Sequence, residues 1–179
     1  NGWSVPIVLA DSNGEKGVRF ADVNADGLTD LIAASSTRIV YLNNGVSGWV
    51  ASSSWNFPES FISGSGKDLG VQIADVNGDG HEDILRSYAS STEGTTTRVY
   101  LHSGVGWTLD ASWSIPEVFV DDTSVTQHDY GVRLYDYNAD GLIDIVRSGK
   151  NPNVQRAYTN TGRGWIYYPT YVPQEYFAT

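Results

Sequence analysis

The stretch Asp22-Val23-Asn24-Ala25-Asp26-Gly27-Leu28-Thr29-Asp30 occurs in three related forms along this chain of 179 residues. It returns as Asp75-Val76-Asn77-Gly78-Asp79-Gly80-His81-Glu82-Asp83 and as Asp136-Tyr137-Asn138-Ala139-Asp140-Gly141-Leu142-Ile143-Asp144. All three copies share the pattern D-x-N-x-D-G-x-x-D, and we call them the acidic loops. The rest of the chain can be arranged around them.

The spacing of oxygen-bearing residues in each acidic loop predicts a cation site. Side chains at positions 1, 3 and 5 of a tight loop converge, and the glycine at position 6 permits the turn that directs the carbonyl of position 7 to the same point. The carboxylate at position 9 completes the set. The predicted side-chain ligands are Asp22, Asn24, Asp26 and Asp30; Asp75, Asn77, Asp79 and Asp83; and Asp136, Asn138, Asp140 and Asp144. The predicted backbone-carbonyl ligands are Leu28, His81 and Leu142.

The donor chemistry selects calcium. Every predicted ligand is a hard oxygen, and no Cys or His side chain stands at a ligand position, which favours Ca²⁺ over zinc or copper. Each loop carries three carboxylates and one amide, so that a bound calcium would relieve their mutual repulsion. The alternative is that the loops are acidic surface turns, because Asp, Asn and Gly are common turn residues. Repetition in the same register favours three calcium sites.

The sequences around each loop distinguish among calcium-binding motifs. An EF-hand requires Glu at position 12 and flanking helices, whereas position 12 is Ala33, Arg86 and Arg147. The segments before the loops, 17–21, 70–74 and 131–135, alternate apolar and polar residues as strands do. Short, mostly apolar runs follow at 31–34, 84–87 and 145–148. Each loop is therefore predicted to be the turn of a β-hairpin.

A strand, a D-x-[DN]-x-D-G-x-x-D loop and a second strand, repeated along the chain, resemble the FG-GAP/VCBS type of calcium-binding repeat. The resemblance implies an integrin-α-like β-propeller, and similar repeats occur in fungal lectins and in bacterial surface, lyase and toxin-complex proteins. The Phe-Gly and Gly-Ala-Pro signatures of the integrin version are absent, so the bacterial type is the closer match.

The expected fold is all-β, with three four-stranded antiparallel blades in one partial propeller domain that covers residues 1–179. Residues 1–16 are expected to be the outermost strand of a preceding blade and a linker, because Asn1-Gly2-Trp3 resembles the phrases ending in Trp49, Trp107 and Trp165. Blades are expected at 17–69, 70–130 and 131–179. Third strands are predicted at 38–42, 98–101 and 156–158, and the polar residues 90–97 are predicted to form a longer turn. Propellers close with about four to eight blades, so we expect self-association or the remaining blades of a larger propeller.

Composition limits the class of protein. The 6 Trp, 11 Tyr and 19 Gly suit short strands and many turns, and the absence of Cys excludes a disulfide framework. The net charge is −10, and three calcium ions would bring it to −4. The sequence has no basic stripe, so a nucleic-acid partner is not expected. No run of 18 apolar residues is present, so membrane insertion is not expected.

The search for catalytic chemistry finds none. The segment Ser63-Gly64-Ser65-Gly66-Lys67 lacks the glycine and the hydroxyl residue that a phosphate loop needs, and reads as a linker. His81, His102 and His128 are expected at the surface. Asp121, Asp122 and Asp129 are expected to be solvated loop charges. The repeated Trp residues are expected to pack between neighbouring blades rather than to stack on sugars.

The sequence therefore predicts a non-enzymatic, calcium-stabilised propeller module that binds a protein or a cell surface, within a secreted or surface protein of the bacterial type. One alternative is a carbohydrate-binding lectin. Another is a scaffold segment of a larger toxin-complex-like or polysaccharide-degrading protein. A structural calcium requirement favours an extracellular or cell-surface location, where calcium is near millimolar.

Overall fold

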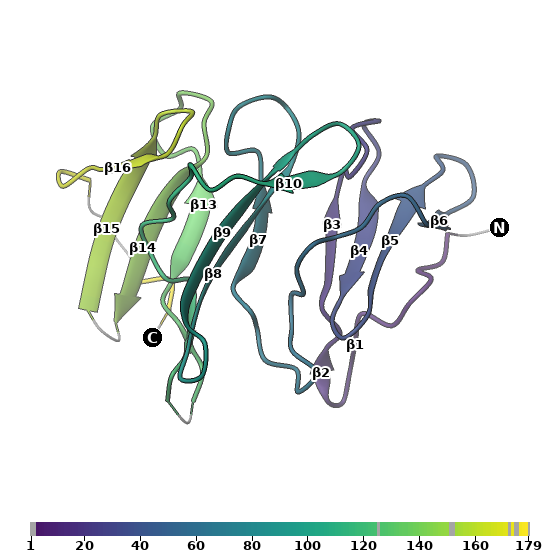
Figure 1. Ribbon diagram of the computed structural model, residues 1–179, viewed down its shortest axis with the longest axis horizontal. Coiled ribbons are helices and arrows are strands. Elements are labelled where there is room, and N and C mark those ends of the chain that lie inside the picture. Colours follow the sequence, from purple (N-terminus) through teal and green to yellow (C-terminus); the bar gives the residue numbers. More distant parts are fainter. Residues whose placement is uncertain (1–2, 125, 151–152, 172, 174–175, 179) are drawn as a thin grey trace.

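The computed structural model describes residues 3–124, 126–150, 153–171, 173 and 176–178. Every regular element within these residues is a β-strand, which confirms the predicted all-β class. Three sets of four antiparallel strands follow one another along the chain (Figure 1). The described residues hold no helix long and apolar enough to cross a bilayer.

Each set of four strands surrounds one acidic loop. The first sheet consists of β3 (Val18–Ala21), β4 (Asp30–Ala34), β5 (Arg38–Asn43) and β6 (Trp49–Ser52). The second contains β7 (Val71–Ala74), β8 (Asp83–Ser90), β9 (Gly94–His102) and β10 (Trp107–Leu109), and two further short strands, β11 (Val120–Asp122) and β12 (His128–Asp129), join it at β8. The third consists of β13 (Val132–Tyr135), β14 (Asp144–Lys150), β15 (Asn153–Asn160) and β16 (Trp165–Tyr167). These bounds confirm the predicted strands on both sides of every loop.

The three sheets share one register. Each strand pairs with the next along the chain, and corresponding residues face each other in all three sheets. The pairs Leu31–Tyr41, Ile84–Tyr100 and Ile145–Tyr158 are directly opposite. Position-by-position comparison of the repeats is therefore justified by backbone pairing as well as by sequence.

Short hairpins precede the sheets. Strands β1 (Ala10–Asp11) and β2 (Gly14–Glu15) form one before the first sheet. An isolated antiparallel bridge joins Ile62 to Asp68 before the second sheet. Strands β11 (Val120–Asp122) and β12 (His128–Asp129) form another before the third. The predicted Ser-Gly linker at 63–66 is thus the turn of such a hairpin.

Two hydrophobic cores lie between neighbouring sheets. The first joins Ile32 and Val40 of the first sheet to Val71 and Ile84 of the second, through Phe57, Phe61 and Ile62 of the segment that connects them. The second core repeats this arrangement between the second and third sheets, through Ile115, Phe119 and Val120. Burial of this kind contributes roughly 25 cal/mol per Å² of apolar surface, so contact between sheets stabilises the molecule.

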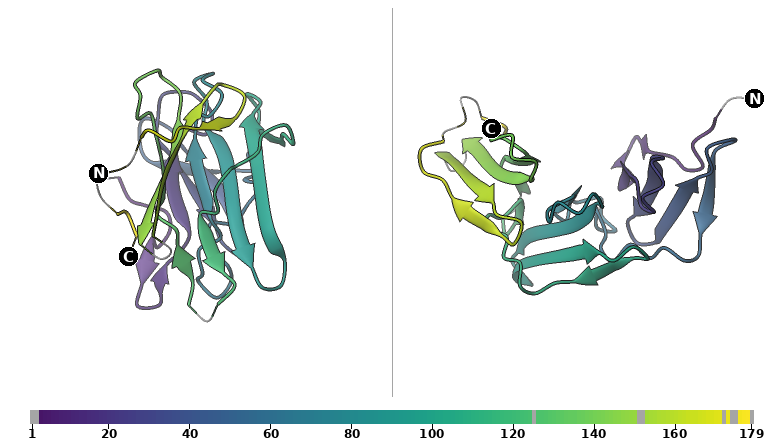
Figure 2. Two further views of the ribbon diagram at one scale, coloured as in Figure 1. Left: turned by 90° about the vertical axis from the view of Figure 1, so that its left-hand side faces the viewer. Right: turned by 90° about the horizontal axis from the view of Figure 1, so that it is seen from above.

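The sheets lie side by side along an arc that does not close (Figure 2). Ile73 of β7 and Leu134 of β13 pack against the cores that precede their sheets. Phe20, at the corresponding position of β3, is 49% exposed. The first sheet therefore presents apolar surface on the side where the other two are covered.

Three predicted features differ from the structure. Within the polar stretch 90–97, predicted to form a longer turn, only residues 91–93 lie in the turn, whereas Ser90 ends β8 and residues 94–97 open β9. Thr95, Thr96 and Thr97 favour strands. The expected linker at 121–124 contributes β11, which pairs in parallel with the extension of β8. Residues 3–9, expected to form an outermost strand, contain none; Ala10 is the first residue in a strand.

Candidate functional site

The three acidic loops lie at the same edge of the molecule, at the top in Figure 1. Each connects the first strand of its sheet to the second, and the ninth residue of each loop opens that second strand. The tight turn depends on two left-handed backbone positions. The sixth residues Gly27, Gly80 and Gly141 have φ of 83°, 85° and 89°, which glycine adopts without strain. Ala25 and Ala139, at the fourth position, have φ of 57° and 61°.

Hydrogen bonds from the backbone organise the first half of each loop. The carboxylate of Asp22 accepts N–H groups of Asp26 and Gly27 at 3.1 and 2.8 Å. The amide oxygen of Asn24 accepts the N–H of Asp26 at 3.2 Å, and its nitrogen donates to the Asp26 carboxylate at 3.0 Å. The second and third loops repeat this pattern through the following bonds: Asp79 and Gly80 to Asp75, Asn77 to Asp79, Asp140 and Gly141 to Asp136, and Asn138 to Asp140.

The ninth residue of each loop is fully buried and has a different role. Asp30, Asp83 and Asp144 are each 0% exposed. In the first loop, Asp30 accepts the N–H of Val23 at 3.0 Å and the N–H of Asn43 at 2.7 Å. The corresponding donors are Val76 and His102 for Asp83, and Tyr137 and Asn160 for Asp144. This carboxylate therefore joins the loop to the third strand of its own sheet.

Burial and neighbouring acids raise the pKa of these carboxyl groups. For Asp83, burial is the largest cause, and the charges of Asp79 and Asp75 add to it, so that its pKa rises to about 6. Burial likewise raises the pKa of Asp30 and of Asp144, with repulsion from the loop carboxylates acting in the same direction. A cation near these groups would favour their charged forms.

The donor set of each loop fits a hard cation, because it consists of carboxylate and amide oxygens. Within the described residues, however, no group of three or more His, Cys, Asp or Glu side chains is arranged to hold a metal ion. The predicted ligand sets, including the Leu28, His81 and Leu142 carbonyls, therefore stay predictions.

An additional acid, Glu82, lies near the first two acidic loops. The charges of Asp22 and Asp75 raise the pKa of Glu82, although burial is the larger cause. Its Oε2 atom is buried without a hydrogen-bond partner among the described residues. Glu82 is not among the ligands predicted above, and its only signal in the sequence is its place beside Asp83.

His102 is buried, contrary to the expected surface position. It is 7% exposed, and its Nε2 lies 2.9 Å from the carbonyl oxygen of Val23 in the first acidic loop. Its ring stacks on Trp55, with centroids 5.4 Å apart. Asn160 makes the corresponding bond to the Val76 carbonyl at 2.8 Å. The end of the third strand thus fastens one sheet to the acidic loop of its predecessor.

The Trp residues pack between neighbouring sheets, as predicted. Trp55 contacts Trp107 with ring centroids 5.5 Å apart, and Trp113 contacts Trp165 at 5.0 Å. The interplanar angles of 66° and 64° are edge-to-face arrangements, which aromatic rings favour. These rings pack against one another and so contribute to the contact between sheets.

The acids expected to be free in the segment before the third sheet are paired. Asp122 accepts the Lys67 ammonium at 2.6 Å and the Tyr88 hydroxyl at 3.2 Å. Asp121 accepts the Tyr130 hydroxyl at 2.6 Å, and Asp129 pairs with Arg133 at 3.2 Å. The partners of Asp122 could not be found from a local pattern, because Lys67 and Tyr88 lie 55 and 34 positions away from it.

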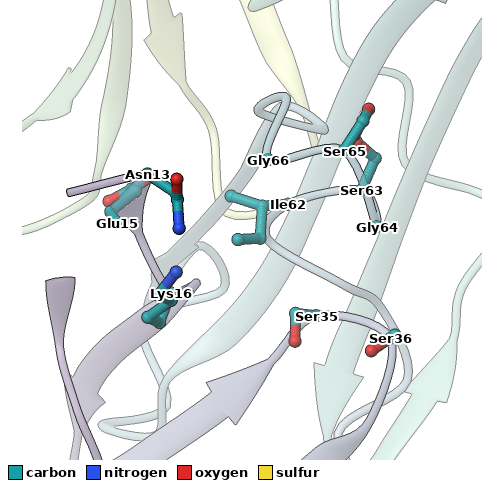
Figure 3. A pocket seen from close by; sticks show the side chains of 10 residues that line it. All are labelled: Asn13, Glu15, Lys16, Ser35, Ser36, Ile62, Ser63, Gly64, Ser65 and Gly66. Atoms are coloured by element: carbon teal, nitrogen blue, oxygen red, sulfur yellow. The ribbon is translucent and has the colours of Figure 1, made fainter. Parts of the chain in front are cut away.

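Two polar cavities occupy corresponding positions in the first and second repeats. The first, of about 290 Å³, lies between the β1–β2 hairpin, the β4–β5 turn and the 62–66 turn (Figure 3). Its lining residues are Asn13, Glu15, Lys16, Ser35, Ser36, Ile62, Ser63, Gly64, Ser65 and Gly66. The second, of about 410 Å³, is lined by Ser63, Leu69, Arg86, Tyr88, Ser90, Ser91, Thr92, Glu93 and Asp122. Each cavity lies between three elements: the hairpin that precedes a sheet, the turn between the second and third strands of that sheet, and the hairpin that follows the sheet.

Hydroxyl, amide and charged groups dominate both cavities, so they suit a polar ligand. In Figure 3 the amine of Lys16 and the amide of Asn13 lie on one side, and the hydroxyls of Ser63 and Ser65 on another. No local pattern in the sequence predicts either cavity. The Ser-Gly segment, predicted to be a linker, borders the first cavity, and Ser63 borders both.

Comparison with known proteins supports a repeat-based fold. No curated protein matches the sequence. A solved lectin of Agrocybe aegerita, described for its specific recognition of non-reducing terminal N-acetylglucosamine, is similar over 88% of this chain and 38% of its own, with 23% identity and a TM-score of 0.51. The chain thus spans less than half the length of that lectin, and the likeness concerns the fold. Residues 22–86 match the family described as FG-GAP-like repeat, which confirms the resemblance stated above. The chain therefore carries an FG-GAP-like repeat at residues 22–86.

Proposed function

We propose that this chain is a non-enzymatic, glycan-binding module whose three sheets are blades of a calcium-stabilised β-propeller. The recurrence of a polar cavity at the same place in two successive repeats carries the proposal of binding. The lectin nature of the similar structure supports a glycan as the ligand. A site for sugars needs hydroxyl, amide and charged groups that converge, and both cavities supply them.

Glycan binding can be tested on an immobilised panel that includes terminal N-acetylglucosamine. The first cavity would be altered by Ser35→Ala with Ser63→Ala, and the second by Ser91→Ala with Thr92→Ala. Arg163→Ala, an exposed change outside both cavities, is the matched control. Binding should fall at least tenfold in the cavity variants and stay unchanged in the control. Equal binding by all variants would contradict the proposed sites.

The calcium proposal rests on three loops with the same hard-oxygen donor set. The ion would be held by the side chains at positions 1, 3, 5 and 9 and by the position-7 carbonyl, where it would neutralise clustered acids. A Kd of about 0.1 mM at about 1 mM calcium would add roughly 1.4 kcal/mol per site. This requirement suits a secreted or surface-displayed protein.

Thermal unfolding in 2 mM calcium, in EDTA and in magnesium tests the calcium proposal separately from glycan binding. We expect a calcium-specific rise in Tm that is lost when Asp22, Asp75 and Asp136 are replaced by Asn. An identical Tm in calcium and EDTA would mean that the loops are acidic turns held by their own hydrogen bonds.

A protein ligand is the second candidate. Val46 and Val105, at the tips of the β5–β6 and β9–β10 turns, are 84% and 82% exposed. Two apolar tips at corresponding positions of neighbouring sheets suit contact with an apolar protein surface. Loss of adhesion to a cell surface in Val46→Ser with Val105→Ser, with glycan binding intact, would favour this candidate.

A further inference from the structure

A buried glutamate fastens the segment after the first sheet to the second sheet. Glu59 is only 5% exposed. Its carboxylate accepts hydrogen bonds from Arg86 at 3.0 Å, from Arg98 at 2.9 Å and from Tyr100 at 2.7 Å. All three donors belong to the second sheet. We call residues 55–61 the first linker and the three donors its socket.

The same contact recurs between the second and third sheets. Glu117, which is 4% exposed, accepts from Arg147 at 2.6 Å, from Arg156 at 3.1 Å and from Tyr158 at 2.6 Å. Residues 113–119 are the second linker. Both linkers read Trp-x-x-Pro-Glu-x-Phe, and the same carboxylate oxygens receive the same kinds of donor. The repetition of this buried ion pair with the same geometry indicates a specific contact between consecutive sheets.

The N-terminal segment, residues 3–9, occupies the corresponding place on the first sheet. Trp3 contacts Trp49 at 5.3 Å, as Trp55 contacts Trp107. The Lys16 N–H donates to the Leu9 carbonyl at 2.9 Å, as the Leu69 N–H donates to the Phe61 carbonyl at 2.8 Å. By this register Ile7 stands where the linkers have glutamate.

The first sheet lacks the arginine pair that the other two sockets contain. Ala33 and Ile39 pair with each other across β4 and β5, as Arg86 pairs with Arg98 and Arg147 with Arg156. Tyr41 holds the tyrosine position. An apolar residue in the N-terminal segment is thus matched with an apolar socket, and a glutamate with an arginine socket.

The segment after the third sheet makes the backbone contact that the two linkers make. The Phe177 N–H donates to the Ser148 carbonyl at 2.7 Å, as Phe61 donates to Ala34 and Phe119 to Ser87. Phe177 is 37% exposed, whereas Phe61 and Phe119 are each 1% exposed.

We propose that the linker and socket residues form a pairing code between consecutive sheets, in which a buried linker glutamate requires a sheet that presents two arginines and a tyrosine. The first sheet does not meet this requirement. Ala33 and Ile39 would leave such a carboxylate without partners, and burying an unpaired charge is strongly unfavourable.

The test is made in the full chain. It replaces the first linker's glutamate and the two arginines of its socket by the apolar residues found at the corresponding positions of the N-terminal segment and the first sheet. Glu59→Ile alone leaves two arginines unpaired, and Arg86→Ala with Arg98→Ile leaves the glutamate unpaired. We expect each of these to lower Tm by roughly 10 °C, and the triple variant to recover most of that loss. Arg163→Ala is the control for loss of an exposed charge. The code would be overturned if the Tm of the triple variant were no higher than the value obtained by adding the losses of Glu59→Ile and of Arg86→Ala with Arg98→Ile. This test does not depend on glycan or calcium binding.

Discussion

At the scale of single residues, Glu117 shows how a buried charge can be retained. Burial acts to raise the pKa of Glu117, but hydrogen bonds from Tyr158 and Arg147 outweigh it and hold the pKa below the ordinary 4.5. A carboxylate with a lowered pKa contributes stability that is present above the unfolded value and lost as pH falls through the folded value.

The Glu117→Gln variant should therefore be less stable than the parent protein at pH 6, and this difference should shrink as the pH falls from about 4.5 to 3. Urea unfolding across this range measures the effect. Glu93→Gln, an exposed change, should leave the profile unchanged. A gap between Glu117→Gln and the parent protein that is independent of pH would contradict the expectation.

The fourth position of the acidic loops offers a second test at this scale. It is Ala25, Gly78 and Ala139, all with positive φ. A Cβ on Gly78 would lie 2.8 Å from Cδ2 of Leu142 in the next loop. Gly78→Ala should cost about 1–2 kcal/mol, because it adds a left-handed alanine and a close contact. Ala139→Gly should be neutral or stabilising by up to about 1 kcal/mol, and chemical denaturation distinguishes the two.

At the scale of the element, the acidic hairpin combines two roles that substitution can separate. Asp144 accepts two backbone N–H groups inside the sheet, whereas Asp140 lies in the exposed part of the loop. The ninth residue would therefore support the hairpin even without an ion. This division explains why the ninth carboxylate is buried although positions 4 to 6 of each loop are exposed.

Asp144→Asn should destabilise the protein by about 1–3 kcal/mol in EDTA as well as in calcium, because one buried N–H loses its acceptor. Asp140→Asn should have little effect in EDTA and should reduce the gain from calcium. Unfolding curves of both variants under both conditions test this. Equal losses for the two variants in EDTA would contradict the separate roles.

At the scale of the whole molecule, the two ends of the arc differ in chemistry. The first sheet exposes Phe20 and carries an apolar socket, while the far end exposes Phe177. A second copy added end to end would meet, on the first sheet, the place that the N-terminal segment already occupies.

Sedimentation velocity from about 5 to 100 µM in calcium should therefore show one species with the mass of a monomer, 19.5 kDa. The physical reason is that this face of the first sheet is already in contact with residues 3–9 of its own chain. A dimer that persists at the lowest concentration would contradict this account of the ends.

The sequence by itself determined the features that depend on neighbouring residues. The acidic loops, the strands on either side and the all-β class follow from turn chemistry and from period-two alternation, which act over fewer than about ten residues. The repeated Trp positions also predicted contact between sheets, because repetition revealed them as structural.

Only the tertiary structure decided how the sheets recognise one another. Glu59 lies 27, 39 and 41 positions from its three partners, and the Val23 carbonyl lies 79 positions from His102. No local pattern specifies which side chains such separations bring together. The cavities, the buried His102 and the place of Trp3 were therefore hidden in the sequence, because each arises from packing one sheet against the next.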